Sequence, residues 1–277
     1  MPLAISLPSK RRLAVPPRFL VIAFFSCIPL ITGCRSKDAG ESGWFAREAD
    51  GETLAARALE GQTADERRRN VIALAESDDA GADWAIKTFD SIARTDVDAT
   101  VRCAAIGGLG KSADHRSVST LVKITEAIDA DGSDVKKAAP VVRWDAIRLL
   151  AVIVDRHTYQ EPQRPDIVRC MMERAGTDAD RNVRLTAIDT LAYFAEPQIP
   201  GCLVECLDAD DFAIRNAAEK SLIALTGATN QHDADAWRTW LAAHPDPFAG
   251  AGKSPPELEN RKTAEKPWWP WRGMSAV

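Results

Sequence analysis

Residues 98–109 read D-A-T-V-R-C-A-A-I-G-G-L, and three later stretches of the chain repeat their pattern. The later copies are A-P-V-V-R-W-D-A-I-R-L-L over residues 139–150, D-R-N-V-R-L-T-A-I-D-T-L over 180–191 and D-F-A-I-R-N-A-A-E-K-S-L over 211–222. Their arginines are separated by 41, 41 and 31 residues, a period typical of stacked helical repeats. The sequence therefore predicts an all-α fold, an α-solenoid of about four to five helix pairs.

Each copy reads as an amphipathic helix. The β-branched residue and the positions four, five and eight residues later cover about 140° of one helix face. A second amphipathic segment follows each copy, such as the one carrying Val118, Leu121 and Val122 after the first. Because no such pair of helices can bury its apolar faces alone, the pairs are expected to stack on one another.

The arginine of each copy lies inside the apolar arc, where a guanidinium needs a partner. Three copies place an aspartate four residues earlier, where it can cap the helix and offer a carboxylate to its own or a neighbouring arginine. The second copy has Ala139 there instead. We expect a structural ladder along the stack, with a row of anion-binding arginines as the alternative. Its members are Asp98, Arg102, Arg143, Asp180, Arg184, Asp211 and Arg215.

The pattern D-x-x-V-R-x-x-A-I-x-x-L resembles the HEAT repeat, of the short type that also occurs in bilin-lyase-like bacterial proteins. The best copy runs from Asp98 to Ile124, and the resemblance covers roughly residues 63 to 244. Departures from the pattern are Ala139, Glu219 at an apolar position and two long spacings. The resemblance implies a binding surface, and it permits bilin-lyase-like chemistry without carrying it, because fold does not imply function.

The N-terminus reads as a targeting segment. Four basic residues precede an apolar run of thirteen residues, Phe19 to Ile31, which as a helix spans about 20 Å against roughly 30 Å of membrane hydrocarbon. A cleaved signal peptide over residues 1–33 is therefore favoured over a membrane helix. The sequence L-I-T-G-C at residues 30–34 resembles the lipobox of bacterial lipoproteins. That resemblance implies a lipid on Cys34, which would anchor the protein to a membrane of the bacterial cell envelope, outside the cytoplasm.

The remaining boundaries follow from composition. Residues 34–52 are polar and read as a tether, residues 53–248 as the solenoid, and residues 249–277 as a disordered, Pro-rich tail. Thr63 and Glu66 form a capping-box pattern that opens a degenerate first repeat. The tail carries Trp268, Trp269 and Trp271, which could lie at a membrane interface, cover the last repeat or contact a partner.

No catalytic motif, metal-ligand spacing or cofactor motif is present in the sequence. Cys202 and Cys206 lie in an apolar stripe and read as buried small side chains, with a disulfide as the alternative in an oxidising compartment. Cleavage before Cys34 leaves a net charge of about −9, which argues against nucleic acid as a partner. We therefore expect a non-catalytic protein-interaction scaffold whose partner the sequence does not name, with a small-molecule or tetrapyrrole-handling protein as the alternative.

Two insertions, Ala130–Ala139 and Arg156–Arg164, explain the long spacings between copies. Insertions in repeat proteins map to loops, and loops often carry binding residues. Aromatic anchors contribute much of the affinity of protein interfaces. Trp144 and Tyr159 are therefore the candidate binding residues, on the concave surface that a solenoid creates and on the second insertion.

Overall fold

The computed structural model describes residues 50–126 and 138–255, and the structural statements below concern these residues. They form eleven α-helices and three short 3₁₀ turns. The α-helices are α1 (Gly51–Glu60), α2 (Ala64–Glu76), α3 (Asp83–Thr95), α4 (Ala99–Ser112), α5 (Val118–Thr125), α6 (Pro140–Asp155), α7 (Arg164–Thr177), α8 (Arg181–Leu191), α9 (Ile199–Leu207), α10 (Phe212–Thr226) and α11 (Ala234–Ala243). The 3₁₀ turns are η1 (Asp78–Gly81), η2 (His115–Ser117) and η3 (Glu161–Gln163).

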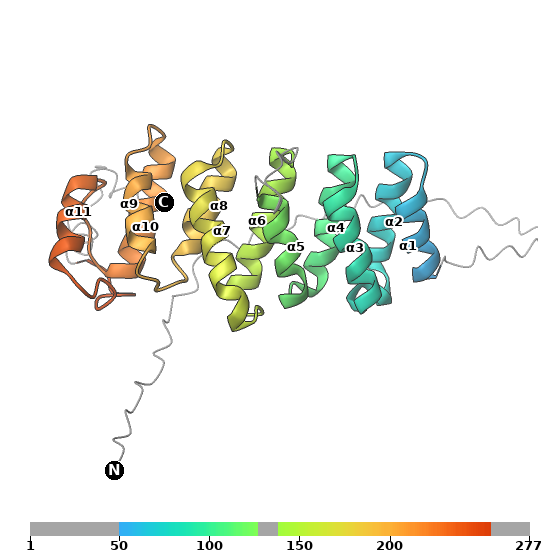
Figure 1. Cartoon of the computed structure of the whole chain (residues 1–277), viewed down its shortest axis with the longest axis horizontal. Helices are drawn as coiled ribbons and strands as arrows, with labels where there is room; N and C mark the ends of the chain where they lie inside the picture. Colours follow the sequence, from blue (N-terminus) through green and yellow to red (C-terminus); the bar gives the residue numbers. More distant parts are fainter. Residues whose placement is uncertain (1–49, 127–137, 256–277) are drawn as a thin grey trace, which may run out of the picture. The chain divides into compact units, whose positions relative to one another are not determined.

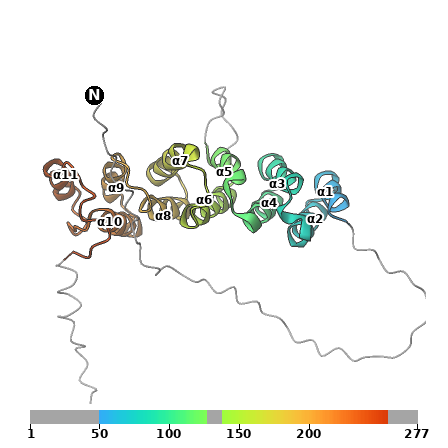
Figure 2. The same ribbon diagram turned by 90° about the horizontal axis from the view of Figure 1, so that it is seen from below.

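The helices follow one another in sequence order and form two layers (Figures 1 and 2). The odd-numbered helices make one layer and the even-numbered helices the other. Helices α1 to α10 pack in consecutive pairs, α1 on α2 through α9 on α10, and α11 packs on α9. Each helix also packs against the next helix of its own layer, and the even-numbered helices pack against one another more extensively. The predicted all-α solenoid of stacked helix pairs is confirmed.

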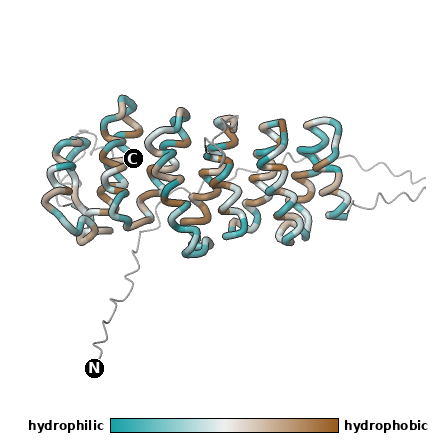
Figure 3. Tube along the Cα trace, in the orientation of Figure 1, coloured by the Kyte–Doolittle hydropathy of each residue, from teal (hydrophilic) through white to brown (hydrophobic). Residues whose placement is uncertain are grey.

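The four copies of the repeat pattern are helices α4, α6, α8 and α10 of the even-numbered layer. Their β-branched residues are buried, and so are the leucines that close the pattern: Leu109, Leu150, Leu191 and Leu222. Figure 3 shows hydrophobic and hydrophilic positions alternating along the helices, as amphipathic packing between two layers requires. Helix α2 belongs to the same series, because Arg67 occupies its fourth position as Arg102 does in α4.

Helix α1 begins inside the segment that the sequence analysis assigns to the tether. Asp50 caps it by accepting a hydrogen bond from Thr53 N at 2.8 Å, and Ala55 and Ala58 are buried against the following helices. The next helix starts at the predicted cap, where Thr63 Oγ1 accepts from Glu66 N at 3.1 Å. The reciprocal bond differs from the predicted capping box, since the Glu66 carboxylate accepts from Gln62 N.

The last helix pair is closed by a buried carboxylate. Glu219 stands at an apolar position of the repeat in α10 and is only 4% exposed. It accepts five hydrogen bonds: from Trp237 Nε1 and Thr229 Oγ1, both at 2.6 Å, and from the backbone N–H groups of Asn230, Gln231 and His232. These bonds satisfy the buried charge and fix the loop that leads to α11.

The segment after α11 does not match the predicted start of disorder at Ala249. Residues 249–255 are described, and they contact the end of α10, where Gly252 N donates to Ala224 O at 3.0 Å. Gly250 O lies so close to Gly227 that a Cβ there would meet it at 2.2 Å, and Gly227 has a positive φ of 70°. A glycine is required at 227 on both counts.

The second insertion folds against the rest of the stack. Thr158 Oγ1 donates to Ala113 O at 2.6 Å and Gln163 Nε2 donates to His115 O at 2.9 Å, so the loop is held to the turn after α4. Most of the first insertion lies outside the described residues, as do the signal peptide, Cys34, nearly all of the tether and the Trp-containing tail. Among the described helices, none is long and apolar enough to cross a membrane.

Candidate functional site: a groove across α2, α4 and α6

The aspartates of the predicted ladder cap helices. Asp98, Asp180 and Asp211 are the N-caps of α4, α8 and α10, and each carboxylate accepts from backbone N–H groups of the first turn. At α6 the N-cap is Ala139, which has no side chain to accept such a bond. These contacts fix where the helices begin.

The arginines of the ladder donate to backbone carbonyls that precede their own helices. Arg102 Nε donates to Ala93 O at 2.7 Å and Arg184 Nε donates to Ala175 O at 2.9 Å. Arg143 and Arg215 make the corresponding bonds to Ala138 O and Ala209 O. The expectation that cap aspartates would be their partners is therefore corrected: helix-end carbonyls are close enough to satisfy the guanidinium groups first.

Carboxylates join one of these arginines, and Arg67 at the same position of α2, to the next helix pair. Arg143 forms a bidentate ion pair with Asp178, with N–O distances of 2.7 and 2.9 Å, and both side chains are buried. Arg67 makes the equivalent pair with Asp96. Asp96 and Asp178 stand two residues before a cap aspartate, in the sequence D-x-D. Burial raises the pKa of Asp178, but the bonds from Arg143 and Asp180 N hold it below its usual value overall.

At the junction between these two rungs, the described residues form no ion pair with the ladder arginine. Ala139 replaces the cap aspartate, and Arg102 has only its bond to Ala93 O in the described part of the chain. Arg143 thus joins two helix pairs, whereas the bonds of Arg102, Arg184 and Arg215 to backbone carbonyls lie within their own pairs.

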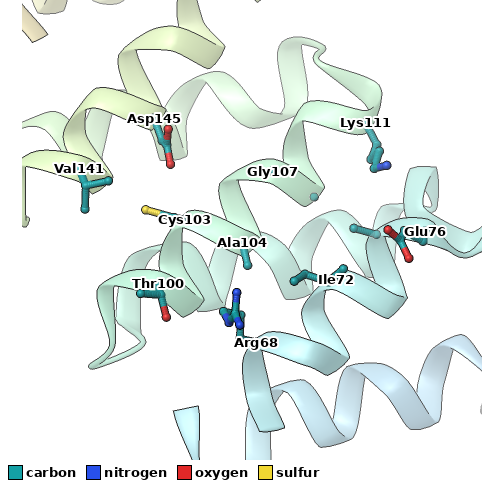
Figure 4. A pocket seen from close by; sticks show the side chains of 12 residues that line it. Arg68, Ile72, Glu76, Thr100, Cys103, Ala104, Gly107, Lys111, Val141 and Asp145 are labelled. Atoms are coloured by element: carbon teal, nitrogen blue, oxygen red, sulfur yellow. The ribbon is translucent and has the colours of Figure 1, made fainter. Parts of the chain in front are cut away.

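A groove of about 490 Å³ opens on the outer face of the even-numbered layer, across α2, α4 and α6. Figure 4 shows α4 as its floor, with side chains of α2 and α6 on either side. Its apolar and small residues are Ile72, Ala75, Cys103, Ala104, Gly107, Gly108 and Val141, and its polar ones are Arg68, Glu76, Thr100, Lys111 and Asp145.

The groove exists because α4 carries small residues where its neighbours carry large ones. Thr100, Cys103, Ala104 and Gly107 follow the spacing of one helix face and point outward. A Cβ on Gly107 would meet no atom within 4 Å, so this position opens into the groove. A Cβ on Gly108 would come within 2.7 Å of the buried Phe89 ring, so the adjacent glycine faces the core and lets α3 and α4 approach closely.

The chemistry of the groove is that of a binding surface. Burial and the neighbouring Asp145 raise the pKa of Cys103 to about 12, which leaves this thiol protonated and poorly nucleophilic. Arg68 and Asp145 each make their ion pair within their own helix, with Asp65 and Arg148. The described residues contain no cluster of three metal-ligating side chains.

The odd-numbered layer has a different outer face. Ion pairs link its successive helices: Asp83 with Arg116, Glu126 with Arg169, Glu196 with Arg164 and Asp208 with Arg238. Most of these side chains are a third or more exposed, so each pair contributes less than about 1 kcal/mol. On that face charge meets charge, whereas four of the large exposed apolar side chains lie on even-numbered helices: Ile72, Val141, Val152 and Phe212.

Neither of the two candidate binding residues from the sequence analysis, Trp144 and Tyr159, lines the groove. Trp144 is half-buried on α6 with the Arg148 guanidinium 5.0 Å from its ring centroid, and it does not line the groove. Tyr159 packs on the buried Phe194, with ring centroids 6.2 Å apart, so it holds the second insertion in place. The position directly after each repeat arginine holds a different residue type in each copy. Such variation is typical of an outward-facing position, and it could have indicated Cys103 and the outer face from the sequence.

Comparisons with known proteins agree with this architecture. A family model described as HEAT repeats matches residues 133–223. Similar solved structures include an engineered protein determined by the Northeast Structural Genomics Consortium, which has 20% sequence identity and a TM-score of 0.45 over 72% of this chain and 89% of that one. No curated protein matches. The matched range contains helices α6 to α9 and most of α10, and in the described structure α1 to α5 precede them and α11 follows.

Proposed function

We propose that this protein is a non-catalytic scaffold that binds a protein partner through the outer face of its even-numbered helices, with the groove over α4 at the centre. The observation that carries this proposal is the contrast between the two faces. The odd-numbered face pairs its charges across neighbouring helices, while the even-numbered face leaves Ile72, Val141 and the small residues of α4 open. Exposed apolar surface rimmed by polar residues is typical of interaction sites.

Gly107 allows a direct test. An arginine at this position would project into the groove without a clash, and replacing a helical glycine favours the helix by up to about 1 kcal/mol. We expect Gly107→Arg to remain folded by circular dichroism and to lose partner capture from detergent-solubilised membranes. Gly176→Arg is the matched control, since Gly176 is an exposed glycine of α7 with equally open space. Equal capture by both variants would exclude the groove.

We also propose that the scaffold is held at a membrane of the cell envelope by a lipid on Cys34. The support is the coincidence of a basic segment, an apolar run of signal-peptide length and the sequence L-I-T-G-C at residues 30–34. A fatty-acid probe added to growing cells should label the wild type and leave Cys34→Ser unlabelled. The variant should also move from the membrane fraction to the soluble fraction. Labelling of both proteins to the same extent would contradict the proposal.

The groove also supports a second candidate, the binding of a small molecule. Its volume of about 490 Å³ falls in the range of small-ligand sites, and Arg68 and Lys111 could meet carboxylates such as those of a tetrapyrrole. Protein purified from its native host should then carry a visible absorbance band, which Gly107→Arg should remove. A colourless protein with intact partner capture would leave the scaffold function alone.

A further inference from the structure

Two cysteines of α9 face the same neighbouring helix. Cys202 and Cys206 are four residues apart, so their side chains lie on one side of α9. Cys202 Sγ lies 3.7 Å from Met172 O, and Cys206 Sγ lies 3.7 Å from Ala175 O, one turn further along α7. The two sulfur atoms thus stand side by side at the α7–α9 contact.

A ladder arginine stands next to this pair. Arg184 Nε donates to the same Ala175 O that Cys206 approaches. Arg67 and Arg143 have carboxylate partners, Asp96 and Asp178, but Arg184 has no ion pair among the described residues. The Arg184 guanidinium can therefore take a thiolate as its counter-charge.

The electrostatics of the pair differ from those of the other cysteines. A hydrogen bond from Cys202 and the nearby Arg184 charge lower the pKa of Cys206, although burial opposes the shift. The same contact, together with burial, raises the pKa of Cys202. Burial raises the pKa of Cys170 to about 11, and Cys103 is raised as well. Among the cysteines that the structure describes, Cys202 and Cys206 are thus the pair whose thiols lie close enough to interact, and cysteine sulfur is a ligand that soft metal ions prefer.

The geometry points to a soft cation rather than a disulfide. Side chains four residues apart on one helix start from Cβ atoms about 5–6 Å apart, whereas a disulfide needs about 3.8 Å. Two sulfurs at the wider separation can bind opposite sides of one ion. In the described residues no third cysteine, histidine or carboxylate completes a cluster. We propose that Cys202 and Cys206 form a two-coordinate site for a soft monovalent cation of the Cu⁺ type.

The charges of this site balance. The Cys206 thiolate and the Cys202 thiol take up one Cu⁺, and the Cys202 proton is released to solvent. The resulting bis-thiolate complex carries one negative charge, which lies beside the positive Arg184 guanidinium. Cys202 is half-buried and follows the exposed Gly201, so the ion has a route from solvent.

The test uses the reduced full chain with Cys27→Ser and Cys34→Ser as background, so that the N-terminal thiols do not compete. Cu⁺ is added under a chromophoric competing chelator. We expect one Cu⁺ per chain and a thiolate-to-copper ultraviolet band. Cys202→Ser and Cys206→Ala should lose both, while Cys103→Ser and Cys170→Ser keep them. Arg184→Gln should weaken binding by about tenfold, as loss of a neighbouring supporting group does.

Circular dichroism of each variant separates loss of the site from loss of the fold. The half-buried Cys202→Ser is the decisive variant, since it disturbs packing least. Wild-type affinity in folded Cys202→Ser, or an equal loss in Cys103→Ser, would overturn the proposal. Neither result would affect the groove, because the two sites lie on different layers and are tested by different variants.

Discussion

Two neighbouring junctions of the even-numbered layer are built differently. Where α6 meets the next helix pair, Arg143 and Asp178 form a buried bidentate ion pair. Where α4 meets α6, Arg102 bonds only to Ala93 O in the described structure, and Ala139 stands where other repeats have a cap aspartate. Leu109 and Leu150 are nevertheless fully buried at the second junction. Among the described residues, apolar packing is therefore the main contact between α4 and α6, and the groove spans this junction and the one between α2 and α4.

The largest effect is expected from removing the buried carboxylate. Asp178→Asn leaves the buried Arg143 without its counter-charge and should cost about 3–5 kcal/mol in the free energy of unfolding, measured with urea. Asp211→Asn is the matched control, because the Arg181–Asp211 pair is exposed and should contribute less than about 1 kcal/mol. Similar losses in the two variants would remove the distinction between buried and exposed rungs.

Acid should weaken the same rung. Burial raises the pKa of Asp96 and of Asp178, but hydrogen bonds from arginine and from backbone N–H groups together lower both values overall in the folded protein. A carboxyl with a lowered pKa stabilises the fold above its unfolded value of about 3.9, and this contribution is lost as the pH falls through the folded pKa. The urea concentration at the midpoint of unfolding should therefore decrease when the pH is lowered below about 4. Asp178→Asn should show a shallower fall, and an identical slope would contradict this assignment.

A smaller effect is expected at the two glycines of α4. Gly108→Ala pushes a methyl group against the Phe89 ring and should destabilise by about 1–3 kcal/mol. Gly107→Ala, one residue away, meets open space and should stabilise by about 0.5–1 kcal/mol. Thermal unfolding of the two variants side by side measures the difference. The same sign in both would mean that Gly107 does not face the groove.

An effect of similar size is expected from adding a cap at the junction between α4 and α6. Ala139→Asp supplies the side chain that caps α4, α8 and α10, and it should stabilise by about 0.5–2 kcal/mol. The new carboxylate would also lie at the junction where Arg102 lacks one. Comparison with Ala139→Asn separates the contribution of the cap from that of the charge, since asparagine caps a helix without adding a charge. An absence of stabilisation in both would show that this helix start has no use for a cap.

The repeat pattern made the stack predictable, because its period, caps and buried leucines are all local signals. The partners of the arginines were less accessible: the D-x-D sequence that contains Asp96 and Asp178 shows which carboxylates are available, but not that they reach an arginine in the preceding helix pair. Helix α1 escaped notice because Leu54, Ala55 and Ala58 are too few to show a period. The groove depends on the small outward-facing side chains of α4 between larger side chains of α2 and α6. This difference in size has an effect only once the three helices lie side by side, so the sequence alone did not reveal it.

Glu219 bears on how an array of this kind can grow. Repeat proteins lengthen when a new helix pair stacks on an exposed apolar face. At the C-terminal end, the Glu219 carboxylate holds the loop to α11 and the Trp237 indole, and residues 249–255 cover the end of α10. A pair added after α11 would have to displace these contacts, whereas a pair inserted between two existing repeats would find matching faces on both sides. In the described structure, the bonds of Glu219 thus make the contact between α10 and α11 unlike the contacts between the earlier repeats.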